Sequence, residues 1–455
     1  MNAPLTIKET REGLINKSFS AVELVDAYLK QIDEKNKDLN AFLTITREEA
    51  YKQAKHFDKD KPLAGVVVAY KDLFLTKGVR TTAGSKVLES YIPAYSATVV
   101  RKLEDAGTIM IGKTNCDAWA HGASGENSDF GPTRNPWNKE YVPGGSSSGS
   151  AAAVSAGLSL VAMGTDTGGS TRQPANFCGL VGLKPTYGAI SRYGVIAMAS
   201  SLDTMGSFGH TVDDVEAMFN VLKGEDGFDA SVINFESPKK KTRYTLGIAK
   251  EFFVKGLDRE VEDAVTRAIE VFKKMGIDVI EISLPHTKYA VPVYYIIQPA
   301  EVSSNLGRFD GIRYGNGRDS FSDEAKRRIM LGTYVLSAGY YDAFYLKAQK
   351  VRSKLIQDFD NAFTKVDAII SPVSPTPPFK LGEKTDDPLQ MFLEDIYTAG
   401  INLTGIPGLS IPFEFSKKGL PIGFQILGPR FSEDLLFDIG KKFHKEIGFV
   451  PKIAK

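Results

Sequence analysis

Two stretches rich in glycine and serine carry residue types that could take part in catalysis. They read Pro143-Gly-Gly-Ser-Ser-Ser-Gly-Ser150 and Gly164-Thr-Asp-Thr-Gly-Gly-Ser170. The apolar run 158–163 predicts a buried strand that leads through the second stretch into a helix opening at Ser170. Glycine turns leave backbone N–H groups unobstructed, and a helix N-terminus adds unpaired donors. Because such donors stabilise the oxyanion of amide hydrolysis, we expect an oxyanion hole made of the N–H groups of Thr167, Gly168, Gly169 and Ser170.

A serine hydroxyl is a weak nucleophile until a base removes its proton. The chain's five histidines all lie outside the glycine- and serine-rich region: His56, His121, His210, His286 and His444. Lysine can replace histidine where burial favours the neutral amine. Lys71 directly follows the apolar run Val66–Tyr70, which predicts a strand buried on both faces. Lys71 is therefore a candidate base, and Ser146 could relay the proton between Lys71 and Ser170.

Other interpretations of these residues compete with this one. A strand-end lysine is usually solvated, and Gly-Gly-Ser-Ser is more often a plain turn. A phosphate-binding loop is a more specific alternative, but its motif Gly-x-x-x-x-Gly-Lys-Ser/Thr does not occur there. Gly-x-Ser-x-Gly is absent around Ser170, which counts against an α/β-hydrolase. Cys178 is interpreted as a small buried thiol. Cys116 with His121 is too small a ligand set, so no metal is expected.

Helix and strand patterns alternate along the chain and must position these residues. Helices are predicted from Ser20, which has capping-box spacing to Glu23, over Ser96–Ala106 and Arg259–Met275, and after Ser432. Strands are predicted over Val66–Tyr70, Thr108–Ile111, Ile277–Ile282 and Asp367–Ile370, and as a hairpin pair over Leu409–Phe413 and Ile422–Leu427. This alternation indicates an α/β fold with a mostly parallel sheet. We predict a single domain over residues 1–455, with an N-terminal helical segment at 1–60 and a largely helical insertion at 289–363.

The composition is that of an ordinary globular protein: 455 residues, 42% hydrophobic and 24% charged. Lys plus Arg (56) nearly cancels Asp plus Glu (55), and the net charge of +1 gives no sign of a strongly basic nucleic-acid face. Two cysteines suit a reducing compartment rather than a disulfide scaffold. We expect no signal peptide and no membrane span, and hence a cytoplasmic protein.

Taken together, these residues resemble the amidase signature family. Its hallmark is a Gly-Gly-Ser-Ser loop, matched at 144–147, followed by Asp-x-Gly-Gly-Ser-x-Arg-x-Pro, matched at 166–174. The resemblance implies a large twisted sheet, mixed but mostly parallel, with helices on both sides. It also implies that Ser170 is the nucleophile, Lys71 the ultimate base and acid, and Ser146 the bridging serine after a cis peptide bond. One departure is Ser148, which stands where the family commonly has glycine.

Further segments resemble one subgroup of this family, the A subunits of aspartyl/glutamyl-tRNA amidotransferases. These segments are Asn115–Ser128, Asn135–Asn138, Lys184–Gly188, Ser191–Gly194, Arg308–Gly315, Lys326–Gly332 and Gly339–Asp342. The resemblance implies a glutamine-hydrolysing ligase component that works in a heterotrimer with B and C subunits. This chain would need no cofactor of its own. A partner would use ATP and Mg²⁺, hold most of the misacylated tRNA, and convert Glu-tRNA(Gln), Asp-tRNA(Asn) or both.

Free glutamine carries a carboxylate and an ammonium, so its selection requires a cation and an anion near the nucleophile. By position in the subgroup's motifs, Arg328 is predicted to clamp the carboxylate, Asp395 to bind the ammonium and Tyr295 to line the pocket. The alternative is a stand-alone amidase acting on small aliphatic or aryl amides. A scaffold without activity is disfavoured because the lysine and both serines are present.

Overall fold

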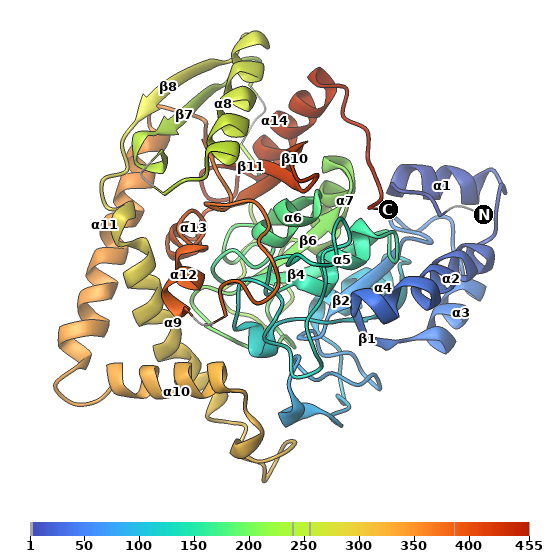
Figure 1. The fold of residues 1–455 in the computed structure, drawn as a ribbon. Helices are drawn as coiled ribbons and strands as arrows, with labels where there is room; N and C mark the ends of the chain where they lie inside the picture. Colours follow the sequence, from blue (N-terminus) through green and yellow to red (C-terminus); the bar gives the residue numbers. More distant parts are fainter. Residues whose placement is uncertain (1–2, 239–240, 254–255, 386, 455) are drawn as a thin grey trace.

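The computed structural model describes residues 3–238, 241–253, 256–385 and 387–454, which build a large β-sheet surrounded by helices (Figure 1). The strands are β1 (Phe42–Ile45), β2 (Val67–Lys71), β3 (Ile109–Thr114), β4 (Val161–Asp166), β5 (Val181–Lys184), β6 (Thr204–Gly209), β7 (Thr245–Ala249), β8 (Asp278–Ile282), β9 (Ala368–Ser371), β10 (Gly408–Phe415) and β11 (Pro421–Leu427). Within these described ranges they form one 11-stranded sheet in the order β1-β3-β2-β4-β6-β5-β10-β11-β9-β7-β8. The predicted α/β fold is confirmed.

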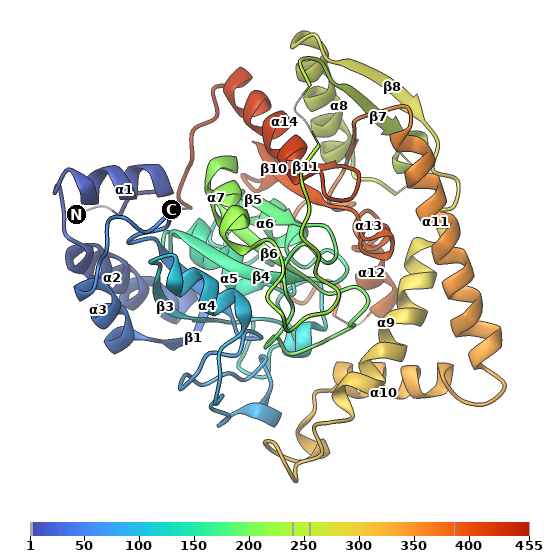
Figure 2. The same ribbon diagram turned by 180° about the vertical axis from the view of Figure 1, so that it is seen from behind.

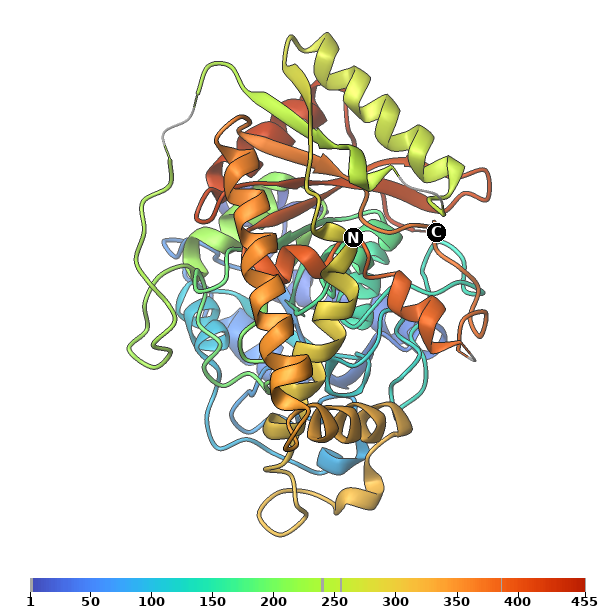
Figure 3. The same cartoon turned by 90° about the vertical axis from the view of Figure 1, so that its left-hand side faces the viewer.

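Helices cover the sheet and extend beyond one of its edges. They are α1 (Ile7–Ile15), α2 (Ala21–Leu39), α3 (Arg47–Lys55), α4 (Thr98–Asp105), α5 (Ser148–Ser155), α6 (Arg172–Cys178), α7 (Val212–Leu222), α8 (Arg259–Lys274), α9 (Ala290–Leu306), α10 (Asp323–Val335), α11 (Lys347–Phe363), α12 (Pro388–Leu393), α13 (Ala399–Thr404) and α14 (Glu433–Glu446). Helix α7 lies against β5 and β6, as Figure 2 shows, while α8 and α14 pack on β10 and β11. Helices α9, α11 and α13 share a separate apolar cluster, with α11 alongside α9 (Figure 3). In the described part of the chain, no helix combines the length and apolarity that crossing a bilayer would take.

The centre of the sheet brings two buried strands together in parallel. Every residue of β2 and of β4 is buried, and Tyr70 pairs with Met163. Burial on both faces of the sheet explains why apolar residues follow one another in these strands instead of alternating with polar ones. Since the two strands are parallel, their carboxyl ends reach the same edge of the sheet. Lys71, the last residue of β2, and Asp166, the last of β4, therefore end near one another.

The sheet is mixed and contains less parallel pairing than the sequence pattern indicates. Strand β2 is parallel to β3 and β4, and β7 is parallel to β8 and β9. The other six of the ten pairings between described strands are antiparallel. The hairpin of β10 and β11 agrees with the prediction. Strand β6, however, inserts antiparallel between β4 and β5, a long-range pairing that local periodicity does not encode.

Local differences from the sequence predictions occur near the two ends. Segment 1–60 contains helices α1 to α3, but β1 within it pairs with β3, so it is not wholly helical. Helix α1 was not predicted, although Thr6 and Glu9 form the same capping box as Ser20 and Glu23. Ser432 precedes α14 as predicted, but its hydroxyl donates to the Pro429 carbonyl oxygen (2.6 Å) and does not cap the helix. The other predicted elements are present, although β4 (Val161–Asp166) begins three residues after the predicted run 158–163 and α6 begins at Arg172, not at Ser170.

The largest cluster of buried apolar side chains runs from Ala3 to Phe443 and takes in strands from β2 to β11. We propose on this basis that the chain folds as one domain, with the helical residues 289–363 as an insertion within it.

Candidate active site

Lys71 is completely buried at the carboxyl end of β2 and faces three hydroxyl groups. Its Nζ lies 2.7 Å from Ser146 Oγ, 3.0 Å from Ser147 Oγ and 2.8 Å from Thr165 Oγ1. Burial disfavours the ammonium form and lowers the pKa of Lys71 to about 8, although nearby acidic groups oppose this change. A lysine in this state can lose its proton near neutral pH and accept one from a hydroxyl.

The loop that carries Ser146 is held between Lys71 and the second glycine-rich stretch. The Gly145–Ser146 peptide bond is cis, as the family resemblance implied. The Gly145 N–H donates to Gln173 Oε1 (3.0 Å), and the Ser147 N–H donates to the Ser170 carbonyl oxygen (3.2 Å). The structure therefore brings the predicted residues Lys71, Ser146 and Ser170 to one place.

Ser170 lies in the turn after β4, with 8% of its surface exposed, and not in a helix. Helix α6 begins at Arg172, two residues later than predicted. The reason is the Asp166 carboxylate, which accepts the N–H groups of Gly169, Thr171 and Arg172 and so fixes a turn before the helix.

Asp166 and Arg172 form a buried ion pair under this turn. Arg172 Nε donates to Asp166 Oδ2 (3.1 Å) and Nη2 to Oδ1 (3.0 Å), and both side chains are fully buried. Burial alone would raise the pKa of Asp166, but the guanidinium outweighs it and lowers the pKa to about 2. Asn402 Nδ2 also donates to Asp166 Oδ1 (3.0 Å). A fully satisfied network of this kind holds the Ser170 turn rigid.

The predicted oxyanion donors divide into two groups. The Gly169 N–H donates to Asp166 Oδ1 (2.9 Å), so it is engaged within the protein and is not available to a substrate. In the ranges that the structure describes, no hydrogen bond uses the N–H groups of Thr167, Gly168 or Ser170. A Cβ on Gly168 would come within 2.6 Å of the Tyr294 hydroxyl, so this position leaves room only for glycine. These three N–H groups are therefore available to a developing oxyanion.

The three residues predicted for the glutamine pocket form one contiguous cluster. The Tyr295 hydroxyl donates to Asp395 Oδ2 (2.8 Å), and the Arg328 guanidinium lies 5.4 Å from the centroid of the Tyr295 ring. Arg328 and Tyr295 line a cavity of about 170 Å³, together with residues of the loop Gly122–Asn127. The structure thus places a cation and an aromatic ring in the wall of one cavity, with the Asp395 carboxylate bound to that ring's hydroxyl.

The charges of this cluster are set by burial and by neighbouring groups. Burial raises the pKa of Asp395 to about 7, against the opposing effects of the Tyr295 hydroxyl and Arg328. Burial disfavours the Arg328 cation, but Glu324 outweighs it and the pKa of Arg328 is raised. Arg328 donates from Nε to Glu324 Oε1 (2.7 Å) and from Nη1 to Gln298 Oε1 (2.9 Å). Its Nη2 has no hydrogen-bond partner among the described residues, so it is free to bind a substrate carboxylate.

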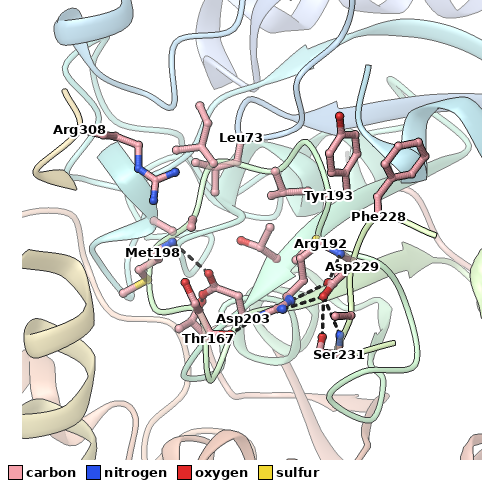
Figure 4. Close-up of a pocket in the computed structure, with 18 residues that line it drawn as sticks. Leu73, Thr167, Arg192, Tyr193, Met198, Asp203, Phe228, Asp229, Ser231 and Arg308 are labelled. Carbon is pink, nitrogen blue, oxygen red and sulfur yellow. Dashed lines mark hydrogen bonds and ion pairs between the residues drawn. The ribbon is translucent and has the colours of Figure 1, made fainter. Parts of the chain in front are cut away.

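A second cavity, of about 440 Å³, adjoins the same turn (Figure 4). Thr165, Thr167, Asp203 and Met198 are among the residues that line it, and Figure 4 shows Thr167 beside Asp203. Thr167 Oγ1 donates to Asp203 Oδ1 (2.7 Å), and burial raises the pKa of Asp203 to about 6. The cavity therefore reaches Thr165, which binds Lys71 directly.

Sequence reasoning missed several residues that build this site. Ser147 and Thr165 hold Lys71, while Glu324 and Gln298 hold Arg328. Ser147 and Thr165 stand in the two glycine-rich stretches, which could have drawn attention to them, whereas nothing in the local sequence marks Glu324 or Gln298. Asp166 and Arg172 stand in the quoted family hallmark, and their opposite charges six residues apart could have indicated an ion pair.

The model of the family described as Amidase matches residues 23–437, and the chain therefore belongs to the amidase family. The resemblance noted in the sequence is confirmed. Within that family, the chain is 53% identical over 458 residues to the A subunit of the glutamyl-tRNA(Gln) amidotransferase of Koribacter versatilis, covering 94% of this chain and 95% of the relative. It is 50% identical over 474 residues to the protein of the same name from Carboxydothermus hydrogenoformans, with 98% of each chain covered.

A solved structure supports the same relationship. The crystal structure of the A subunit of glutamyl-tRNA(Gln) amidotransferase from Thermotoga maritima matches with a TM-score of 0.84 at 39% sequence identity. The match covers 98% of this chain and 96% of the Thermotoga maritima chain. The mixed sheet and its surrounding helices are therefore those of a known amidase-family structure.

Proposed function

We propose that this chain is the glutaminase subunit of a tRNA-dependent amidotransferase. The observation that carries the proposal is the near full-length similarity to proteins named as the A subunit of glutamyl-tRNA(Gln) amidotransferase. The site supplies matching chemistry, because Lys71 contacts Ser146 beside the Ser170 turn. The charged cluster of Arg328 and Asp395 suits an amino acid such as glutamine better than a simple amide.

In the proposed reaction, Ser170 Oγ attacks the side-chain carboxamide carbon of glutamine. Neutral Lys71 takes the hydroxyl proton of Ser170 through Ser146, and the N–H groups of Thr167, Gly168 and Ser170 stabilise the tetrahedral oxyanion. The C–N bond then breaks, and the leaving nitrogen receives the proton from Lys71 through Ser146 to depart as ammonia. Water attacks the resulting ester, yielding glutamate and restoring the Ser170 hydroxyl.

The proposed substrate contacts follow from the free groups of the pocket. Arg328 Nη2 binds the α-carboxylate, the Asp395 carboxylate binds the α-ammonium, and Tyr295 holds Asp395 in place through its hydroxyl. The near-neutral balance of the chain, with a net charge of +1, gives it no strong means of holding tRNA. We therefore propose that B and C subunits complete a cytoplasmic heterotrimer. The partner binds ATP, Mg²⁺ and misacylated tRNA, and uses the released ammonia to form Gln-tRNA(Gln), Asn-tRNA(Asn) or both.

The test is co-purification of this chain with its partners, followed by measurement of ammonia release from glutamine. We expect the assembled complex to hydrolyse glutamine and to do so faster when ATP and misacylated tRNA are present. The isolated chain should be poorly active. Vigorous glutamine hydrolysis by the isolated chain, indifferent to tRNA, would contradict the proposal and favour a stand-alone amidase.

Replacing Arg328 by glutamine tests the pocket. We expect the KM for glutamine to rise about 30-fold, because charge-assisted hydrogen bonds contribute about 1.5–3 kcal/mol. Hydrolysis of propionamide, which has no carboxylate, should be unchanged. Lys326→Gln is the matched control, since Lys326 lies on the same helix but is exposed. An unchanged KM in Arg328→Gln would remove this residue from the pocket.

A further inference from the structure

Asp117 is a fully buried carboxylate that joins two loops of the site and has no role in the mechanism above. Its Oδ1 accepts the Asn127 N–H (2.8 Å) and its Oδ2 accepts the Gly125 N–H (3.1 Å). Its own N–H donates to the Ser146 carbonyl oxygen (3.2 Å). One residue thus binds both the loop beside Arg328 and the loop that carries Ser146.

The fit of the carboxylate between these loops leaves no spare room. A Cβ on Gly145 would lie 2.1 Å from Asp117 Oδ2, and one on Gly122 would lie 2.5 Å from Asp117 Cγ. Both positions must therefore be glycine for the carboxylate to stay where it is. Because Gly122 and Asn127 line the cavity that holds Arg328, Asp117 connects the wall of the substrate pocket to Ser146.

Asp117 also acts on the charge of Lys71. Four groups favour the protonated form of Lys71 against the effect of burial: Cys116, Asp117, Asp166 and Asp203, in decreasing order of strength. Burial raises the pKa of the Cys116 thiol to about 12, so it is neutral at working pH.

Each of the other two carboxylates acts on Lys71 less strongly than Asp117 does. Asp166 is already neutralised by Arg172, and Asp203 is held by Thr167 and by two backbone N–H groups. Asp117 has no ion-pair partner within the described ranges. Of the carboxylates near Lys71 that have no ion-pair partner in these ranges, Asp117 therefore acts on it most strongly.

We propose that Asp117 is a positioning residue with two linked tasks. It holds the Gly125–Asn127 segment against Ser146, and it serves as counter-ion whenever Lys71 carries the proton taken from Ser170. This inference rests on the serine–lysine mechanism of the proposed function. It adds a residue that couples the geometry of the glutamine pocket to proton transfer.

The test is Asp117→Asn in the assembled complex, followed through the pH profile of kcat/KM for glutamine. In the wild type, kcat/KM should rise with pH as Lys71, whose pKa is about 8, loses its proton. Burial raises the pKa of Asp117 itself to about 6, with Glu126 adding to the rise, so Asp117 is ionised at pH 8. Removing its charge lowers the pKa of Lys71. The rising limb of the pH profile of kcat/KM should therefore move to lower pH by about one unit. The plateau of kcat/KM at high pH should fall about tenfold or more, because protonated Lys71 loses its counter-ion.

Asp214→Asn is the matched control. Asp214 is also buried, accepts the N–H groups of Ile7 (2.7 Å) and Thr211 (3.0 Å), and has its pKa raised to about 6 by burial. It is absent from the groups that act on Lys71. The control should leave the limb in place. If Asp117→Asn lowered the plateau but left the limb at its wild-type pH, the counter-ion role would be overturned and only anchoring would remain.

Two further measurements test the role of Asp117. Inactivation of Ser170 by phenylmethanesulfonyl fluoride reports activation of the nucleophile without glutamine, and its pH profile should shift in the same way. If Asp117→Asn does not fold, Asp117→Glu keeps the charge but not both short hydrogen bonds. Asp117→Glu should then raise the KM for glutamine and leave the rising limb of the pH profile at its wild-type pH. A limb moved to lower pH in this variant would contradict the counter-ion role. A wild-type complex that releases no ammonia from glutamine would instead contradict the proposed function.

Discussion

Replacing Ser170 by alanine is expected to lower the rate of ammonia release from glutamine by about 10⁴-fold or more. The substitution removes one oxygen atom from a turn whose shape is set by other groups. Asp166 binds three backbone N–H groups of that turn, and the Ser170 carbonyl oxygen still accepts the Ser147 N–H. We therefore expect the loss to be chemical, with the thermal unfolding temperature unchanged.

A covalent intermediate gives this prediction a second readout. With hydroxylamine present, the wild-type complex should form γ-glutamyl hydroxamate from the Ser170 ester, and Ser170→Ala should form none. Ser148→Ala is the control, because Ser148 is also buried but donates to Thr133 Oγ1 (3.2 Å) and has no proposed role. If Ser170→Ala released ammonia at the wild-type rate, the nucleophile would have to be sought elsewhere.

The parts of the site that were predictable are those encoded by local pattern. The apolar run that ends at Lys71 predicts a buried strand, and burial by itself predicts a lowered lysine pKa. Both are found in the structure. The glycine turn before Ser170 is likewise a local feature. The alternation of helices and strands was enough to predict the α/β class.

The parts that were not predictable depend on contacts between distant residues. Thr165 reaches Lys71 only because β2 and β4 pair in one particular register, which no single strand encodes. The Asp395 carboxylate sits in a segment that reads as surface. In the structure it is half-buried, and the Tyr295 hydroxyl, 100 residues earlier, donates to its Oδ2.

The start of α6 likewise depends on distant residues and could not be predicted from the local sequence. Sequence pattern places the helix start at Ser170, where the glycines end. In the structure Asp166 captures the N–H groups that would have opened that helix. Arg172 and Asn402 in turn hold Asp166 in place. A side chain held by distant partners thus overrides a local helix signal.

Replacing Lys71 by methionine is expected to lower kcat/KM by about 10³–10⁴-fold, because the chain loses its base but not the volume that fills the site. Ser147 Oγ also donates to the Thr165 carbonyl oxygen (3.1 Å), so its hydroxyl remains paired without Lys71. Lys184→Met is the control. Lys184 is also fully buried with a pKa lowered by burial to about 7, but its Nζ donates to the Pro185 carbonyl oxygen and not to a serine.

The pH dependence distinguishes a base from a mere hydrogen-bond donor. With a pKa of about 8, roughly one-tenth of Lys71 is neutral at pH 7, so wild-type kcat/KM should rise about tenfold towards pH 9. Lys71→Met should show no such rise. Lys71→Arg keeps the charge and the donors but does not lose its proton in this range, so it should be as inactive as the methionine variant. Substantial activity in Lys71→Arg would mean that Lys71 only holds Ser146 in place, and the proton of Ser170 would then need another acceptor.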